Sequence, residues 1–403
     1  MADIGGAHAG GLLAPPWLDT APWIPSALTA ARSHEAVSPR RYPLSFTGSG
    51  SEYFRIWIVN LLALVLSAGL YYPWARVRRL RYFHHNTRLD GHAFDFRGKP
   101  ARMLRGFLLV WLLFGAYNLA SQTSGAAALV GLGAIAALWP ALWRGSLRFR
   151  LGHTSWRGLP FAFEGDTAGA YRAFGAFAAL GLPALLLLVF AQARPSDAGF
   201  VLPLLLVLAV ALGPLGWHEV KRYQHRHCVF ADRRSDWQAG RGEVCALFAR
   251  AAALGLAGAL AGGVLFAGVV TLIPAGEVPG GAVLVGGIAM AGFWLPLSLP
   301  HAYLEAHTQN LVWNRTVAPG LRFDSTLGVA PLCRLRVKNL LLLVATLGLY
   351  WPWATVATAR LRLAAVAALS DEPLDRLVGT LQSTSPDASG DAAADLAGFD
   401  FGL

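Results

Sequence analysis

Residues 60–81 read NLLALVLSAGLYYPWARVRRLR and residues 339–360 read NLLLLVATLGLYWPWATVATAR, so one unusual segment occurs twice, near opposite ends of the chain. The two copies agree at 13 of 22 positions. The agreement includes residues that hydrophobicity alone does not select: Asn60/Asn339, Gly69/Gly348, Tyr71/Tyr350, Pro73/Pro352, Trp74/Trp353 and Arg81/Arg360. We therefore interpret the chain as internally duplicated.

The composition indicates a membrane protein. Of 403 residues, 55% are hydrophobic and only 14% are charged, which is more apolar surface than one soluble core of this size buries. Runs long enough to cross about 30 Å of hydrocarbon lie at 103–120, 125–143, 173–193, 200–217, 245–273 and 281–300, with two further runs at 55–73 and 335–353. We expect an all-α polytopic fold with six transmembrane helices plus the two related terminal segments, giving up to eight spans.

The charges of the connections predict the orientation. Arg and Lys are concentrated in 74–102, 144–172 and 218–250, whereas 121–124 has no charged residue and 194–199 and 274–280 have few. By the positive-inside rule the basic connections are cytoplasmic, and we place both termini there too. The net charge of +11 is thus explained by these loops, so we do not expect nucleic-acid binding.

The two repeated segments do not fit this alternation, because each has basic residues on both sides. The first follows Arg40, Arg41 and Arg55, and the arginine cluster that begins at Arg76 comes after it. We favour re-entrant or interfacial helices, broken at Gly69–Pro73 and Gly348–Pro352. Eight ordinary spans are the alternative.

Short aromatic alternations recur in the basic connections. Period-two apolar residues that end in glycine are typical of short, half-buried strands. The segments are LSFTG (44–48), FDFRG (94–98), FAFEG (161–165), VFADR (229–233) and RFDS (322–325). We expect these strands to pair into a small cytoplasmic cap.

The stretch before each strand also repeats. When Pro73 is aligned with Pro140, RYFHHNTRLDGHAFDF falls on RFRLGHTSWRGLPFAF, and a similar match follows Pro214. The unit is a helix end, a basic stretch, a turn, a strand and two spans, in three internal copies and two truncated outer ones. We interpret Asn86, Thr87 and Gly91 as residues of that turn.

These motifs resemble a known family. The stretch from EYFRIW to HAFDF, with its LYYPWA, RRLRYF and NTRLDG strings, and the NLLLLVATLGLYWPWA copy are similar to the DUF898 family of bacterial inner-membrane proteins, also called the YjgN family. The resemblance covers about residues 42–368. It implies a polytopic location in the bacterial inner membrane, but no activity, ligand or catalytic residue.

Three regions are expected along the chain. Residues 1–41 lack a basic signal-peptide start and are rich in Ala, Gly and Pro, so we expect a disordered extension. Residues 42–368 form the repeat-built membrane domain. Residues 369–403 are rich in Asp, Ser, Gly and Ala, and we expect an acidic, disordered tail.

The candidate binding residues are arginines that follow Trp74 at a predicted membrane boundary. They are Arg76, Arg78, Arg79 and Arg81, with Arg148, Arg222 and Arg360 at positions equivalent to Arg81. Arginine pairs with phosphate, so an anionic headgroup or solute is the predicted ligand, and membrane lipids, including anionic phospholipid, are the predicted partners. The alternative is that these arginines only fix topology.

We expect no catalytic, metal or cofactor site. Cys228, Cys245 and Cys333 are too scattered for a metal motif, and the arginines around the histidines of the basic connections would repel a cation. A symmetric contact is expected between Asn60 and Asn339, which would satisfy both amides.

Two functions fit the sequence. One is transport or binding of an anionic lipid or solute at a basic cytoplasmic face. The other is a non-transporting scaffold that binds protein partners through its strand cap. The sequence contains no convergent acid, base and nucleophile, and we do not expect an enzyme.

Overall fold

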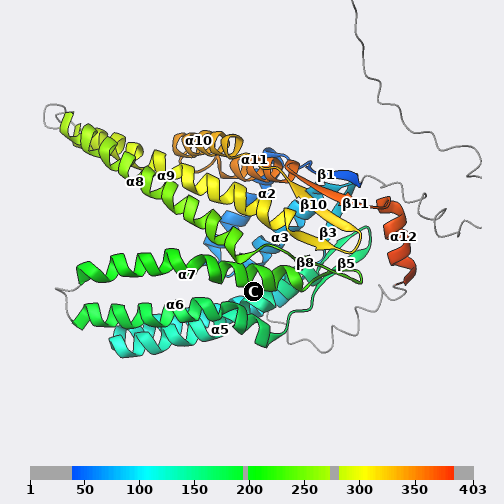
Figure 1. The fold of residues 1–403 in the computed structure, drawn as a ribbon, viewed down its shortest axis with the longest axis horizontal. Coiled ribbons are helices and arrows are strands. Elements are labelled where there is room, and N and C mark those ends of the chain that lie inside the picture. The colour runs from blue at the N-terminus through cyan, green and yellow to red at the C-terminus, as the bar shows by residue number, and fades with distance from the viewer. Residues whose placement is uncertain (1–38, 194–197, 273–280, 385–403) are drawn as a thin grey trace, which may run out of the picture. The chain divides into compact units, whose positions relative to one another are not determined.

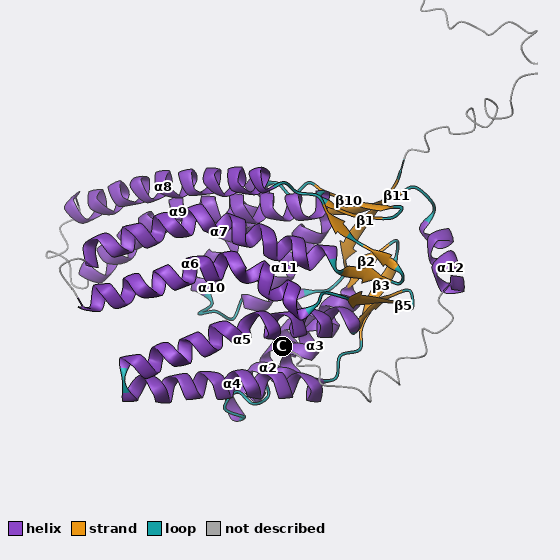
Figure 2. Ribbon diagram, turned by 60° about the horizontal axis from the view of Figure 1, so that its bottom comes forward, coloured by secondary structure: helices purple, strands orange, loops and turns teal. Residues whose placement is uncertain are grey.

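The computed structural model describes residues 39–193, 198–272 and 281–384. Within them the chain is mostly helical, and ten helices form five pairs that extend from one side of a single sheet (Figures 1 and 2). The pairs are α2 (Gly50–Leu66) with α3 (Tyr72–Asn86), α4 (Pro100–Thr123) with α5 (Gly125–Gly152), α6 (Thr167–Ala193) with α7 (Ala198–Arg226), α8 (Arg241–Leu272) with α9 (Gly281–Asn314), and α10 (Val329–Ala345) with α11 (Trp351–Ala364).

The strands are more extensive than a small cap. They are β1 (Arg40–Phe46), β2 (Thr87–Leu89), β3 (His92–Phe96), β4 (Thr154–Trp156), β5 (Leu159–Phe163), β6 (Cys228–Phe230), β7 (Arg233–Arg234), β8 (Asp236–Trp237), β9 (Thr316–Ala318), β10 (Leu321–Ser325) and β11 (Val366–Ser370). All eleven belong to one sheet. The prediction of an all-α protein is therefore corrected. Each short strand is marginal alone and is stabilised by its neighbours, so the predicted strands do pair, but within a sheet that joins every helix pair.

Each helix pair with its two flanking strands forms one module, and the modules repeat. The strands that flank a pair are hydrogen-bonded to each other in the modules that contain β1 and β2, β3 and β4, β5 and β6, β8 and β9, and β10 and β11. The same backbone bond lies at every base: Thr47 N to Asn86 O, Arg97 N to His153 O, Glu164 N to His227 O, Gln238 N to Arg315 O and Thr326 N to Ala365 O, all 2.9–3.0 Å. The predicted repeat of three longer and two shorter units is confirmed.

The sheet closes on itself. β1 pairs with β2 on one side and with β11 on the other, where Tyr42 lies opposite Ala368. The strands at the ends of the sheet order, β7 and β8, are separated in the chain only by Ser235 and pair with β6 and β9 respectively. Both ends thus lie in one stretch of chain, Arg233–Trp237, so the described strands form a nearly closed sheet whose two end strands are only two residues long.

Neighbouring modules are joined by a repeated side-chain contact. At four junctions, a polar side chain of a module's second helix donates to the carbonyl oxygen two residues beyond the first strand of the next module. The pairs are Arg144 Nε with Gly165 (2.7 Å), His218 Nε2 with Ala239 (3.0 Å), Asn310 Nδ2 with Leu327 (3.0 Å) and Arg360 Nη2 with Gly48 (2.9 Å). The last pair joins the fifth module to the first, so the modules form a ring.

Four helices among the described residues are long and apolar enough to cross a membrane. They lie at Pro100–Thr123, Gly125–Gly152, Gly199–Arg226 and Arg241–Leu272. The six expected hydrophobic runs all fall on α4 to α9, although part of 245–273 lies outside the described residues. Totals of six or eight spans remain predictions.

The two repeated segments fold as short helical hairpins. α2 and α10 have 17 residues each, which is about 25 Å at 1.5 Å per residue and less than the hydrocarbon thickness. Each helix ends before a glycine in the left-handed region, Gly69 (φ 91°) or Gly348 (φ 90°), and the next helix starts at a proline in its first turn. The predicted breaks at Gly69–Pro73 and Gly348–Pro352 are confirmed.

The C-terminal segment is partly folded. A last helix, α12 (Leu374–Thr384), lies on the side of the sheet opposite the helix pairs (Figure 2). It buries Leu374, Leu377, Val378 and Leu381 against the sheet, each side chain contributing on the order of 2 kcal/mol. The expected start of a disordered tail at residue 369 is corrected, because α12 has an apolar face that the high Asp content of 369–403 obscured. Residues 1–38 and 385–403 lie outside the described residues.

Closure of the sheet predicts a specific disulfide. Arg41 and Arg322 lie opposite Leu369 on its two neighbouring strands. In a variant without the native cysteines, Arg41→Cys with Leu369→Cys should cross-link on oxidation and hold together two fragments cleaved at a protease site inserted at 194–197.

The matched control is Arg41→Cys with Arg322→Cys. These positions are two strands apart, about 9–10 Å, which is beyond the Cα separation that a disulfide spans. Equal cross-linking of both variants, or of neither, would contradict the closed sheet.

Candidate anion-binding site

The predicted arginines of α3 are held by neighbouring aromatic and amide groups. Arg76 Nη1 donates to the Tyr72 hydroxyl at 2.6 Å, and Arg78 Nη1 donates to Asn60 Oδ1 at 3.2 Å. Arg79 lies 5.8 Å from the centre of the Phe83 ring. Two of these three side chains are exposed and Arg76 is half-buried, so Arg76 is the one that faces away from bulk solvent.

The arginines that recur in register are not brought together. Arg81, Arg148 and Arg222 are each exposed, and no hydrogen bond or ion pair joins them in the described part of the chain. Their counterpart Arg360 donates to the carbonyl oxygen of Gly48 and so holds the fifth module against the first. Identical repeat position therefore places these arginines on separate modules.

A different set of cations does come together. Arg76 of α3, Arg150 of α5 and Lys221 of α7 come from the second helices of three successive modules. The charges of Arg76 and Arg150 lie close enough to repel each other, and so do those of Arg150 and Lys221. All three side chains are half-buried. We call Arg76, Arg150 and Lys221 the cation group.

The cation group has no acidic partner among the described residues. Arg150 Nε donates to the Ser146 carbonyl oxygen at 3.4 Å, and Lys221 Nζ donates to Gln224 Oε1 at 3.1 Å. Cations elsewhere are paired with carboxylates: Arg226 with Asp236, Arg241 with Glu219, Arg315 with Glu243, and both Arg336 and Arg362 with Glu305. Exposed arginines of the same helices, such as Arg79 and Arg148, also have no ion pair in the described part of the chain, so the cation group differs from them in being half-buried.

The thiol of Cys228 on β6 lies near Lys221 but does not supply a negative charge. Burial raises the pKa of the Cys228 thiol to about 11, although the charge of Lys221 acts in the opposite direction. The thiol therefore stays neutral near pH 7 and donates to the carbonyl oxygen of Gln224.

Acidic groups of the neighbouring sheet are engaged elsewhere. Burial alone would raise the pKa of Asp95, but hydrogen bonds from Arg97 and His85 outweigh it and lower that pKa. The carboxylate is therefore ionised at neutral pH and already paired.

The turn residues act within the backbone framework. Asn86 Nδ2 donates to the Tyr82 carbonyl oxygen and Thr87 Oγ1 to that of Phe83. Gly91 has φ 74° in the tight turn between β2 and β3, which a residue with a Cβ rarely adopts. These residues shape the module base.

The histidines of the basic connections also bond locally. His84, His153 and His227 each bond the carbonyl oxygen four residues earlier at 2.7–2.8 Å. The described residues contain no group of three or more His, Cys, Asp or Glu placed to hold a metal ion.

The aromatic residues of the two short hairpins repeat in structure. Tyr71 stacks on Trp74 and Tyr350 on Trp353, with ring centres 5.9 Å apart in both pairs. Pro73 and Pro352 are fully buried at the starts of α3 and α11. Trp353 also packs against Gly50, where an added Cβ would lie 2.2 Å from the indole ring. These residues hold each hairpin together, and Trp353 fastens the last hairpin to the first.

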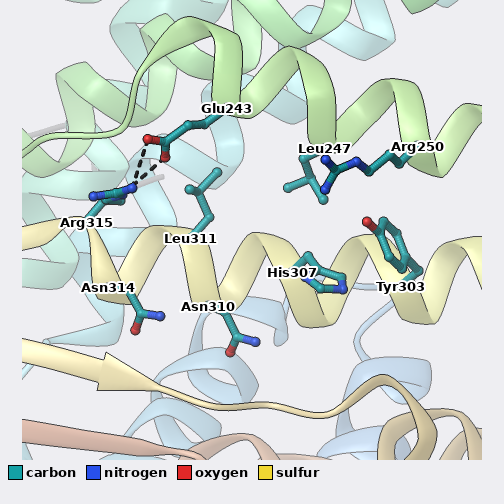
Figure 3. A pocket seen from close by; sticks show the side chains of 9 residues that line it. All are labelled: Glu243, Leu247, Arg250, Tyr303, His307, Asn310, Leu311, Asn314 and Arg315. Carbon is teal, nitrogen blue, oxygen red and sulfur yellow. Dashed lines mark hydrogen bonds and ion pairs between the residues drawn. The ribbon is translucent and has the colours of Figure 1, made fainter.

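A cavity of about 340 Å³ lies between α8 and α9. The Glu243–Arg315 ion pair closes one end, while the side chains of Arg250 and Tyr303 extend into the space between the helices (Figure 3). The Asn310 side chain is hydrogen-bonded to the backbone of Leu327: its Nδ2 donates to the carbonyl oxygen, and its Oδ1 accepts from the N–H. Glu243 and Arg315 neutralise each other, so Arg250 is the only lining arginine of this cavity without an ion pair among the described residues. The positive charge that could attract an anion is therefore smaller here than at the cation group.

The chain matches the profile of a bacterial protein family of unknown function, DUF898, over residues 41–396. The chain belongs to the DUF898 family. It is 28% identical over 124 residues to the inner membrane protein YjgN of Salmonella typhimurium LT2, covering 30% of this chain and 31% of that protein. It is 37% identical over 51 residues to the inner membrane protein YjgN of Escherichia coli K12, 13% of each chain.

These matches span less than a third of the length of the curated relatives. No solved structure matches the chain. Together with the apolar helices, the family relation makes this DUF898 chain a membrane protein in a lipid environment.

The repeated asparagines of this DUF898 protein do not contact each other, so that prediction was wrong. Each faces the second helix of its own hairpin: Asn60 accepts from Arg78, and Asn339 Nδ2 donates to the Ala354 carbonyl oxygen at 3.4 Å. Asn339 Oδ1 is buried without a partner. The two asparagines differ because Ala357 occupies the repeat position of Arg78, so Asn339 has no equivalent arginine from which to accept a hydrogen bond.

This asymmetry predicts opposite effects of one substitution. Asn60→Leu removes an acceptor from Arg78 and should lower the free energy of unfolding by about 1 kcal/mol. Asn339→Leu removes a buried, unsatisfied oxygen and should leave stability unchanged or higher. Thermal unfolding of both variants in the same detergent is the measurement, and equal losses at the two positions would show that the pairing is misassigned.

Proposed function

We propose that this protein binds an anionic ligand, a lipid headgroup or a solute, through Arg76, Arg150 and Lys221. The observation that carries the proposal is the cation group itself. Arg150 is repelled by the charge of Arg76, and Lys221 by that of Arg150; all three are half-buried and have no carboxylate partner among the described residues. A bound anion would compensate these charges.

The energetics favour binding. Removing charged groups from water costs several kcal/mol per ion unless an opposite charge compensates, and like charges add repulsion to that cost. An anion that contacts all three groups relieves both terms. Guanidinium donors match the oxygen atoms of phosphate or carboxylate, and the Lys221 ammonium adds a mobile point charge.

The exposed arginines have a secondary part in the proposal. Arg78, Arg79, Arg81, Arg148 and Arg222 give the ring a basic surface near its sheet, which would raise the local concentration of anions. Arg360 is assigned to closing the ring, because its guanidinium already donates to Gly48.

We also propose a topology. The sheet end of the ring, with the basic connections and both termini, faces the cytoplasm of the bacterial cell, in accord with the positive-inside rule. The two short hairpins are proposed to be re-entrant, since their first helices, α2 and α10, have only 17 residues each, about 25 Å, which is less than the hydrocarbon thickness.

The scaffold alternative has less support. A strand cap that recruits a partner by strand addition needs an unpaired edge, and among the described strands only the two-residue strands β7 and β8 end the sheet. No chemical reaction is part of the proposal.

The proposal predicts a charge-dependent stabilisation. In neutral detergent, added dioleoylphosphatidylglycerol should raise the unfolding temperature of the full chain more than dioleoylphosphatidylcholine does. Arg150→Gln and Lys221→Gln should each weaken the apparent affinity for the anionic lipid about tenfold or more, as expected for a lost charge-assisted contact of 1.4 kcal/mol or more.

Arg148→Gln is the matched control, because it removes an equal charge two residues from Arg150 on an exposed face. It should change the affinity by less than about twofold. If Arg148→Gln weakens binding as much as Arg150→Gln, or if no variant alters the response, the cation group is not the binding site.

A further inference from the structure

An apolar cavity of about 580 Å³ lies between two neighbouring modules. Its walls come from α6, α7, α8 and α9 and include Phe177, Val210, Trp217, Phe248 and Leu304. The helices α7 and α8 are two of those able to cross a membrane. The cavity therefore lies where an apolar ligand could enter from the hydrocarbon, and its volume is within the range of small-molecule sites.

The cavity adjoins the cation group through Trp217. The Trp217 ring lines the cavity, and Lys221 Nζ lies 6.0 Å from the centre of the same ring, one helical turn closer to the sheet. A molecule whose apolar part contacts the indole thus has a positive charge at its polar end.

His301, a polar residue elsewhere on the cavity wall, does not provide an uncompensated positive charge like that of Lys221. His301 lines the cavity and is hydrogen-bonded to Arg336, and Arg336 is paired with Glu305. Glu305, which also pairs with Arg362, partly offsets the positive charge beside His301, whereas Lys221 has no carboxylate partner among the described residues. This difference orients an amphiphilic anion, with its charged end toward Lys221.

We infer that the ligand is a phospholipid with an anionic headgroup, whose headgroup contacts the cation group and whose acyl chain occupies the cavity between α6, α7, α8 and α9. The inference rests on the proposed function and specifies its ligand class. An apolar cavity beside an uncompensated cation complements a chain joined to an anion, whereas a soluble anion would use only the charged half of the site.

Gly213 gives a direct test, because it lines the cavity and an added Cβ would meet no atom within 4 Å. Gly213→Leu should therefore place a larger side chain in the cavity, beginning from a Cβ that meets no neighbour. Gly255→Leu on α8 is the matched control, since Gly255 also has open space around it but does not line the cavity. Both substitutions raise helix propensity equally.

The experiment has two readouts on the full chain, purified with a mixture of dioleoylphosphatidylglycerol and dioleoylphosphatidylcholine and analysed by native mass spectrometry. Gly213→Leu should lower the occupancy of bound lipid about tenfold, and Gly255→Leu should leave it unchanged. Lys221→Gln should abolish the preference for phosphatidylglycerol while lipid of either kind still binds.

The two readouts separate the two proposals. Undiminished occupancy in Gly213→Leu overturns the acyl-chain site even if Lys221→Gln abolishes the headgroup preference. An unchanged preference in Lys221→Gln overturns the proposed function even if Gly213→Leu loses lipid. If Gly213→Leu does not fold, Ala252→Leu fills the same cavity from α8 and is read in the same way.

Discussion

The pairing of the first strand with the last is the constraint on which the rest of the structure depends. β1 and β11 are more than 300 residues apart in sequence, yet they are neighbours in the sheet, and Arg360 adds a contact to Gly48 beside them. Without this closure the five modules would be an open row with two unpaired edges. With it, the fifth module contacts the first, and the helix pairs of all five modules extend from one sheet.

Closure also explains why cations accumulate without partners. The modules derive from one repeating unit, so their basic helix ends all point toward the same sheet. Some of these cations obtain a carboxylate from a neighbouring helix or loop, as Arg315 does from Glu243. Arg76, Arg150 and Lys221 do not, and they are also half-buried, which is why we propose them as the binding group. The apolar cavity lined by Trp217 lies beside Lys221, so an apolar and a positively charged surface adjoin each other there.

Much of this could be read from the sequence, because local patterns encode the module. The repeat, the strand segments and the breaks at Gly69 and Gly348 follow from periodicity and turn chemistry. Closure could not, because strand pairing between distant segments leaves no local signal. Arg150 and Lys221, two residues of the proposed site, were not predicted for a related reason: identical residues in register select Arg81 and Arg148, whereas Arg150 and Lys221 hold different repeat positions.

The most direct measurement of the central claim is side-specific labelling of the sheet turns. Single cysteines at Asp90, Arg157, Asp232 and Pro319, each in a turn between successive modules, would be exposed to a membrane-impermeant maleimide in sealed vesicles of known orientation. The account predicts that all four react from one and the same side. Reaction of any one of them from the opposite side would contradict a single closed ring of modules.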